Sequence, residues 1–295
     1  MGIALESIAL YHQLKVQGVL DGVVEVLELG AQDLKCAHHE QAVIELYRAF
    51  GAEPPARDKL AKMIDSGAAR ALYEGLGFRY ACIDANARYG ALVMDLNFDP
   101  VPDKHKNRYD LVTNHGTTEH VCNQAHAFEM IHDFTKPGGL MLHVVPSMGI
   151  VDHGFFNYQP NFFDALARHN SYKTLGMWLS IGGGGDRINS MIPWSEALIK
   201  AITLNPGHYA DLCVLHRKMH DLPFCIPFQE IYEGSRSRAV MDHYRYVVDG
   251  KFLDGDRVRH LRKVTEISGR ELLGELIKNR IPTRIKYTMK KLFGG

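Results

Sequence analysis

The chain has 295 residues, of which 46% are hydrophobic and 23% are charged. This composition excludes a disordered or fibrous protein, because a chain of this length and apolar content can bury a large core. The 34 lysines and arginines are balanced by 34 acidic residues, so the chain as a whole carries no basic footprint for nucleic acid.

The cysteines and the N-terminal segment indicate the compartment. There are five cysteines, and no two of them have the C-x-x-C spacing that zinc ribbons use. Free thiols fit a reducing compartment, and the N-terminal segment contains Glu6 and lacks the apolar centre of a signal peptide. No apolar run approaches the roughly 18 residues of a membrane-spanning helix. We therefore expect a cytoplasmic protein without a transmembrane segment.

Positive charge gathers near the C-terminus, where no acidic residue follows Glu275. The simplest interpretation is a solvated terminal helix, and the alternative is a helix that makes peripheral contact with an anionic membrane. The apolar positions of this region would also allow a homodimer contact. The basic residues concerned are Lys278, Arg280, Arg284, Lys286, Lys290 and Lys291.

Strands and helices alternate along most of the chain. The run before Gly30 is rich in β-branched residues, which is typical of a buried strand. Strands are predicted over residues 23–30, 78–86, 91–97, 109–116, 140–147, 171–181 and 209–219. Helices are predicted over residues 3–18, 39–50, 67–75, 119–135 and 162–170.

This alternation predicts an α/β fold with a mostly parallel, seven-stranded sheet and helices on both faces. Residues 1–229 are expected to form the main domain. Two long segments, about 35–78 and 147–208, are interpreted as helical insertions that form a lid over a pocket. Residues 230–295 are expected to be a helical C-terminal extension.

Ligands of parallel α/β sheets bind beyond the carboxyl ends of the strands, so the residues that follow each strand are the candidates for a site. The first strand ends in Glu28-Leu29-Gly30-Ala31-Gln32, where Gly30 permits close backbone approach to a ligand. The complete G-x-G-x-x-G pattern is absent, which counts against NAD or FAD. Asp84 follows the second strand, where a carboxylate can accept hydrogen bonds from ribose hydroxyls.

The next strand ends extend the pattern. Asp95-Leu96-Asn97 ends the third strand, and the segment from Asn114 to Val121 follows the fourth. A Lys-Pro-Gly-Gly turn at 136–139 then leads into the fifth strand. Taken together, the order and spacing of these strand-end segments over residues 24–146 indicate a particular fold family more specifically than any single segment does.

On these residues the chain resembles the class I S-adenosylmethionine-dependent methyltransferases, which have a Rossmann-like fold. VLELGAQD resembles the family's first motif, and the Glu-His-Val and Lys-Pro-Gly-Gly segments resemble its region of strands four and five. The resemblance implies S-adenosylmethionine as cofactor, with S-adenosylhomocysteine as product, Asp84 at the ribose and residues 95–97 at the adenine. The implied cofactor-binding residues are Glu28, Gly30, Gln32, Asp84, Asp95, Leu96, Asn114 and His115.

Methyl transfer to an alcohol requires a proton acceptor, and histidine is well suited to that role near neutral pH. His120, His153 and His115 are the candidate catalytic residues, because they lie after the fourth and fifth strands. His153 follows Asp152, an acid that would orient it. No metal is expected, although Asp152, His153 and Glu119 are the set that would bind a divalent ion if one were present.

The sequence therefore predicts a methyltransferase that acts on a small-molecule acceptor, most simply by O-methylation of a sugar or secondary-metabolite hydroxyl with histidine as general base. N-methylation of a small amine is an open alternative, because an amine needs less help from a base. A second alternative is a non-catalytic methyltransferase-like module that binds a partner, since only Gly30 of the glycine-rich pattern is present.

Overall fold

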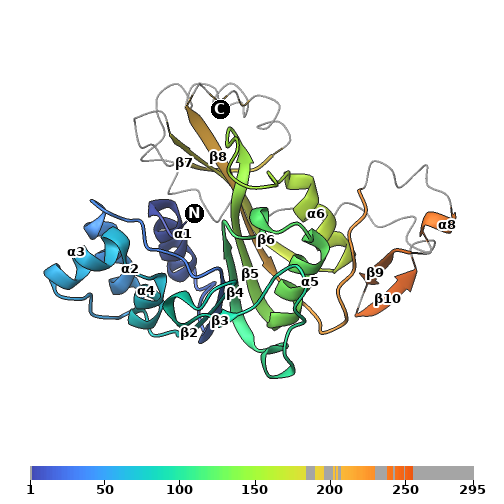
Figure 1. Ribbon diagram of the computed structural model, residues 1–295, viewed down its shortest axis with the longest axis horizontal. Helices are drawn as coiled ribbons and strands as arrows, with labels where there is room; N and C mark the ends of the chain where they lie inside the picture. Colours follow the sequence, from blue (N-terminus) through green and yellow to red (C-terminus); the bar gives the residue numbers. More distant parts are fainter. Residues whose placement is uncertain are drawn as a thin grey trace.

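The computed structural model describes residues 2–183, 190–195, 202, 204, 207–229, 238–241, 243–248 and 250–254. Within these residues a central twisted sheet is covered by helices on both faces (Figure 1). The strands are β1 Glu25–Leu29, β2 Arg79–Asp84, β3 Leu92–Val93, β4 Tyr109–His115, β5 Thr135–Met148, β6 Lys173–Gly183, β7 Ser190–Pro193, β8 His208–Arg217, β9 Arg245–Val248 and β10 Lys251–Asp254.

Apart from α8 (Arg238–Met241), which lies beside β9 and β10, the α-helices divide into two groups, one on each side of the main sheet (Figure 1). The α-helices are α1 Leu5–Val16, α2 Glu40–Ala49, α3 Arg57–Ser66, α4 Ala69–Gly75, α5 Gln124–Phe134, α6 Pro160–His169 and α8 Arg238–Met241. Three short 3-10 helices are η1 Arg88–Gly90, η2 Asp103–His105 and η3 Thr118–His120. No helix in the described part of the chain is long and apolar enough to cross a membrane.

The main sheet has the strand order β3-β2-β1-β4-β5-β8-β6-β7. Strands β1 to β5 are parallel to one another, whereas β8 lies antiparallel between β5 and β6. The sheet therefore confirms the mostly parallel α/β fold but has eight strands rather than the seven predicted. The additional strand, β7, pairs antiparallel with the outer edge of β6, and its four residues carry no alternating pattern that a sequence can show.

Two hydrophobic cores lie on the two faces of the sheet. On one face, Tyr11 of α1 and Tyr47 of α2 pack with the even-numbered side chains of β5, such as Leu142. On the other face, Phe128 of α5 and Phe163 of α6 pack with the odd-numbered ones. Because both faces are covered, β5 is apolar without alternation, as parallel strands in the centre of a sheet usually are.

The helices between β1 and β2 and after β4 differ in detail from the prediction. Residues 57–66 form α3, which the paired prolines upstream had hidden from the sequence interpretation. The helix predicted over 119–135 is two elements, η3 and α5. Asn123 separates them, because its side chain accepts a hydrogen bond from the backbone of His126 and so caps α5.

The region predicted as a helical extension contains a β-hairpin in its described part. Strands β9 and β10 pair antiparallel, and Gly250 in the turn has a φ of 70°. An Asp-Gly pair between two alternating apolar runs is the sequence pattern of a two-residue hairpin, and this local pattern outweighs the helical spacing. The basic residues from 278 onward lie outside the described residues, as does the rest of the chain after 254.

His216 of β8 gives a first testable prediction, because neither of its ring nitrogens has a hydrogen-bond partner among the residues that the structure describes. It is 1% exposed and lies against Phe163, Tyr172 and His143. We expect His216→Leu to raise the free energy of unfolding by about 1–3 kcal/mol at neutral pH, because it removes buried polar atoms that lack partners. Chemical denaturation followed by circular dichroism measures this change.

The sign of the pH dependence follows from the same burial, which lowers the pKa of His216 to about 3. In the unfolded chain His216 becomes protonated near pH 6.5, whereas in the folded chain it stays neutral down to about pH 3. The free energy of unfolding of the wild type therefore decreases as the pH falls from 6.5 toward 3. The stability advantage of His216→Leu over the wild type should therefore increase in that range.

His132→Leu is the matched control. The ring of His132 bonds to the Tyr172 hydroxyl at 2.6 Å and the Leu222 carbonyl at 2.8 Å, so its loss should destabilise. Destabilisation by both variants would contradict the prediction.

Candidate functional site

A cavity of about 350 Å³ lies at the carboxyl ends of β1, β2 and β4. The parallel strands bring the segments that follow them to one edge of the sheet, where ligands of such folds bind. The lining residues are Gly30, Ala31, Gln32, Ile83, Asp84, Ala85, Met94, Asp95, Leu96, Asn97, Gly116, Thr117, His120 and Val121. Six of the predicted site residues are therefore brought together here: Gly30, Gln32, Asp84, Asp95, Leu96 and His120.

The turn after β1 depends on a glycine at position 30. Gly30 has a φ of 75°, which L side chains rarely adopt. A Cβ at this position would lie 2.6 Å from Oγ1 of Thr117 and 2.7 Å from Nε2 of Gln32. The turn can therefore approach the segment after β4 only without a side chain.

Asp84 ties the second strand end to this turn. Its Oδ2 accepts a hydrogen bond from the backbone N–H of Ala31 at 2.8 Å, and its Oδ1 accepts one from the N–H of Asn86 at 3.2 Å. The carboxylate is half-buried at the cavity wall. Asp84 therefore holds the turn in place while it presents a charged acceptor to the cavity.

The segment after the third strand gives the cavity one polar and one apolar wall. The Asp95 carboxylate accepts hydrogen bonds from the backbone and side-chain N–H groups of Asn97 at 2.8 and 2.9 Å. These bonds hold the pKa of Asp95 below its ordinary value. Leu96 is buried beside it and contributes apolar surface.

Sequence reasoning missed Thr117, which joins the first and fourth strand ends. Its hydroxyl donates to the carbonyl of Leu29 at 2.7 Å and accepts a hydrogen bond from Nε2 of Gln32 at 3.0 Å. Its position directly after the fourth strand was the available signal. A threonine hydroxyl is common in loops, however, so the pairing with Gln32 becomes visible only in the folded chain.

Two predicted cofactor ligands lie behind the cavity wall instead of lining it. Glu28 is fully buried, accepts a hydrogen bond from the Tyr80 hydroxyl at 2.5 Å, and has its pKa raised to about 8 by burial. The Asn114 side-chain oxygen accepts from the backbone N–H groups of Thr117 and Thr118. Both side chains therefore shape the turns from which the cavity is built.

His115 does not reach the cavity, contrary to both roles predicted for it. It is the last residue of β4, it is 1% exposed, and its Nε2 lies 2.9 Å from the Tyr11 hydroxyl of α1. Burial lowers its pKa to about 3. Successive residues of a strand point to opposite faces, and position 115 belongs to the face that α1 covers. We therefore correct its assignment to a core residue.

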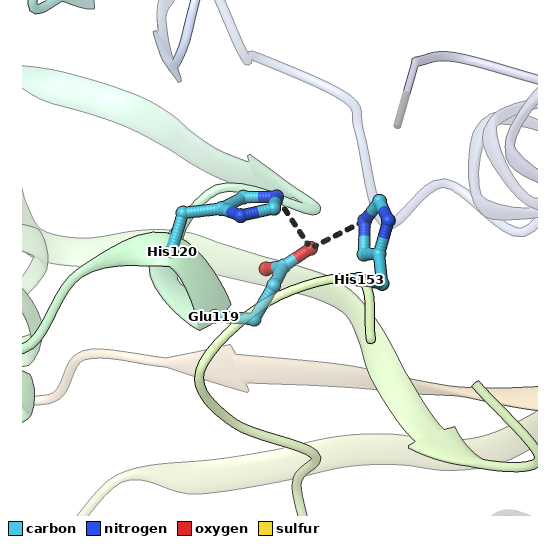
Figure 2. A group of neighbouring side chains, drawn as sticks. All are labelled: Glu119, His120 and His153. Atoms are coloured by element: carbon cyan, nitrogen blue, oxygen red, sulfur yellow. Dashed lines mark ion pairs between the residues drawn. The ribbon is translucent and has the colours of Figure 1, made fainter. Parts of the chain in front are cut away.

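At the cavity edge, Glu119, His120 and His153 form a cluster (Figure 2). Oε1 of Glu119 lies 3.8 Å from Nε2 of His120 and 3.8 Å from Nε2 of His153. The centroids of the two histidine rings are 4.9 Å apart, and the ring planes are inclined at 65° to each other. Glu119 is fully buried, which raises its pKa to about 7, whereas both imidazoles are partly exposed.

The loop after β5 is fixed to this cluster by backbone contacts. The N–H groups of Phe155 and Phe156 both donate to the carbonyl of Glu119, at 2.8 and 3.2 Å. A Cβ on Gly154 would lie 2.9 Å from Cγ of Glu119, so the loop packs closely only with glycine there. This docking places His153 beside Glu119.

The acid beside His153 is therefore not the one that the sequence suggested. Asp152 precedes it with a φ of 57°, in the left-handed region, and the carboxylate that reaches the His153 ring in the described structure is that of Glu119. In the sequence, Glu119 was noted as part of a metal set and of the Glu-His-Val segment, and not as the acid beside His153. Its place in the Glu-His-Val segment directly after β4 was the signal that could have found it.

A family model of methyltransferase domains matches residues 37–189, which is more than half of the chain. The chain belongs to this family. The methyltransferase is therefore an enzyme of the class I fold, and its methyl donor is S-adenosylmethionine. A search of curated proteins finds no significant match.

Solved structures of methyltransferases share the fold only distantly. The 1,6-didemethyltoxoflavin-N1-methyltransferase of Burkholderia thailandensis is 13% identical, with 72% of this chain and 79% of that chain covered at a TM-score of 0.40. An O-methyltransferase from a trans-AT polyketide synthase of Brevibacillus brevis is 14% identical, with 72% of each chain covered at a TM-score of 0.37. These similarities do not bear on which acceptor the methyltransferase uses.

The cavity residues fit S-adenosylmethionine. Gly30 leaves the turn free of a side chain that would fill the space, and the Asp84 and Asp95 carboxylates offer acceptors for hydroxyl and amine groups. Leu96 and Ile83 add apolar surface against which an adenine ring can pack. The charge of the carboxylates also suits a cofactor that carries a positive sulfonium.

Proposed function

We propose that the methyltransferase transfers a methyl group to a hydroxyl of a small molecule, such as a sugar or a secondary metabolite. The observation that carries this proposal is the cluster of Glu119, His120 and His153 at the edge of the cofactor cavity. A hydroxyl must lose a proton when it is methylated, and imidazole is the side chain best suited to accept one near neutral pH. An amine needs no such group once it is neutral.

S-adenosylmethionine supplies a methyl group activated by a sulfonium, which is transferred by in-line displacement. We assign its binding to Gly30, Gln32, Asp84, Asp95 and Leu96, which line the cavity. Positioning of this kind can account for several kcal/mol of the barrier.

Proton acceptance is assigned to the histidines of the cluster. Burial and the neighbouring His153 ring lower the pKa of His120, so His120 is neutral at pH 7 and able to accept a proton. His153 stands on the opposite side of the Glu119 carboxylate from His120 (Figure 2). Both imidazoles are accessible, with 45% of the His120 side chain and 36% of the His153 side chain exposed. The carboxylate faces both rings and stabilises whichever imidazolium forms.

The residues that line a second cavity are suited to a neutral polar acceptor. It has a volume of about 450 Å³ and adjoins the cluster through Phe156, whose N–H bonds to the Glu119 carbonyl. Aromatic faces with surrounding amides are suited to sugar rings and other hydroxylated rings. Its amide residues are Gln124, Asn157, Gln159, Asn161 and Gln229, and its aromatic residues are Phe156, Tyr158, Phe162 and Phe228.

The domain organisation remains a proposal as well. Residues 1–229 would form the catalytic domain, with residues 230–295 as an extension. The described parts of segments 35–78 and 147–208 are not insertions over the site, because the first supplies α2 to α4 on one face of the sheet and the second supplies α6, β6 and β7. A cytoplasmic location, a homodimer and peripheral membrane contact of the basic C-terminus belong to the same proposal.

The first experiment is calorimetric titration of the full chain with S-adenosylmethionine and S-adenosylhomocysteine, with NADH as the control ligand. We expect Asp84→Ala to weaken binding of both sulfur ligands about tenfold to a hundredfold, because loss of a hydrogen bond to a charged group costs about 1.5–3 kcal/mol. Asp103→Ala is the matched control, since its carboxylate is almost fully exposed and lies outside the cavity.

Turnover of a panel of hydroxyl and amine acceptors then tests the finer proposal. Methylation of hydroxyl compounds, with loss of turnover when the cluster is altered, would support O-methylation. Methylation confined to amines would replace it with N-methylation. Equal affinity of Asp84→Ala and Asp103→Ala for the cofactor would contradict the assignment of Asp84.

A further inference from the structure

Glu119 is buried in a way that an isolated carboxylate does not tolerate. It is 0% exposed, and neither of its carboxylate oxygens has a hydrogen-bond partner among the described residues. A buried polar group without a partner costs about 1–3 kcal/mol, and a charged one costs more. Both distances to the histidine nitrogens are 3.8 Å, which is too long for a hydrogen bond.

The three side chains instead surround a shared space. One ligand atom from each of Glu119, His120 and His153 can be chosen so that all three lie within 4.8 Å of one another. Metal–ligand bonds of about 2.0–2.2 Å place neighbouring ligand atoms about 3–3.5 Å apart, so small side-chain rotations would suffice to close the cluster on an ion. Figure 2 shows both rings turned toward the same carboxylate oxygen.

A second acidic side chain, Asp211, is buried and interacts electrostatically with Glu119 of the cluster. Asp211 of β8 is 3% exposed, and one of its oxygens has no hydrogen-bond partner within the described part of the chain. Burial raises the pKa of Asp211 to about 7, and the charges of Glu6 and Glu119 add to that shift. Asp211 is therefore a second buried carboxyl group that interacts electrostatically with Glu119.

We propose that Glu119, His120 and His153 form a binding site for a divalent transition-metal ion, with one carboxylate oxygen and two imidazole nitrogens as ligands. The donor set identifies the class of ion. Two imidazoles and a carboxylate suit zinc, iron, cobalt or manganese, whereas magnesium and calcium prefer oxygen ligands. Three protein ligands leave coordination positions open for an exogenous oxygen.

The role of the ion rests on the proposed function. His120 also lines the cofactor cavity, so an ion bound beside it would hold an acceptor oxygen close to the methyl donor. Coordination to a divalent ion lowers the pKa of a bound hydroxyl, as it does for water. The ion would take over the task that the proposed function gives to the imidazoles. With the ion bound, His120 and His153 are its ligands, and the coordinated hydroxyl loses its proton to solvent because its pKa is lowered. Without the ion, the imidazoles accept the proton.

Metal binding is tested on the full chain, without a histidine tag and after treatment with a chelator. Zn²⁺, Mn²⁺ and Co²⁺ are titrated by calorimetry, with Mg²⁺ for comparison, and the visible absorption of bound Co²⁺ reports its ligands. We expect one transition-metal ion per chain. Loss of a ligand should weaken binding more than tenfold, because even outer partners of metal ligands are worth about 10–100-fold in affinity.

The variants are Glu119→Gln and His153→Ala, with His243→Ala as an exposed histidine control. Replacement of the buried Glu119 could prevent folding, so His153→Ala, on a partly exposed loop residue, gives an independent test. S-adenosylmethionine titration of each variant verifies the fold. Binding that persists in both variants, or the absence of binding in the wild type, would overturn the inference.

The two proposals can fail separately. A chelated chain that binds S-adenosylmethionine and methylates a hydroxyl, but binds no transition metal, would keep the proposed function and reject the metal site. Metal binding with loss of the Co²⁺ spectrum in His153→Ala would establish the site even if the acceptors proved to be amines.

Discussion

Gly30→Ala is expected to weaken S-adenosylmethionine binding by at least about a hundredfold and to lower the free energy of unfolding. A left-handed backbone costs a residue with a side chain about 1–2 kcal/mol. The new methyl group would also lie 2.6 Å from Oγ1 of Thr117 and 2.7 Å from Nε2 of Gln32, which would force the turn away from the segment after β4. Calorimetry with S-adenosylmethionine and chemical denaturation measure the two effects.

The chain contains a matched control for this substitution. Gly51 has a φ of 69°, close to the 75° of Gly30, yet a Cβ there would have no atom within 4 Å. Gly51→Ala should therefore show the backbone cost alone, without a change in cofactor affinity. If the two variants bound S-adenosylmethionine equally well, the turn after β1 would not be part of the cofactor site.

His153→Ala is expected to lower turnover by about 10²–10⁴-fold, which is the usual contribution of a positioned acid or base. The affinity for S-adenosylmethionine should stay within about threefold of the wild type, because His153 does not line the cofactor cavity. His120→Ala should reduce both quantities, since His120 belongs to the cluster and to the cavity wall. Steady-state kinetics and calorimetry on the same preparations separate the two effects.

His243→Ala serves here as the exposed control, with turnover and affinity unchanged. Unchanged turnover in His153→Ala would remove it from catalysis. Loss of cofactor binding in that variant would instead mean that the loop after β5 supports the cofactor cavity, which the contacts of Phe155 and Phe156 with Glu119 would explain.

Much of the fold and the cofactor cavity could be predicted from the sequence. The alternation of strands and helices predicted a mostly parallel sheet, and Gly30, Asp84 and Asp95, which lie at or just after strand ends, line the cavity at its edge. Such predictions succeed for a physical reason. Parallel strands place their carboxyl ends at one edge of the sheet, so position along the chain translates into position in space.

Two properties were harder to predict from the sequence: which face of the sheet a residue lies on, and whether it lines the cavity or supports the turns around it. His115 and Asn114 are neighbours at the end of β4, yet His115 packs against α1 while Asn114 holds the segment that follows the strand. The alternation of side chains in a strand decides which residue faces which side, and a shift of one position reverses the result. Sequence spacing alone placed both residues at the cofactor.

By itself the sequence determined the fold class, the strand ends and the family, because these follow from local patterns of apolar residues, glycines and acids. Only the tertiary structure decided the Glu119–His120–His153 cluster, because His153 is brought there by a loop docked on the carbonyl of Glu119. The order of β8 between β5 and β6 was likewise decided by tertiary packing. Both depend on contacts between residues far apart in the chain, which no local pattern encodes.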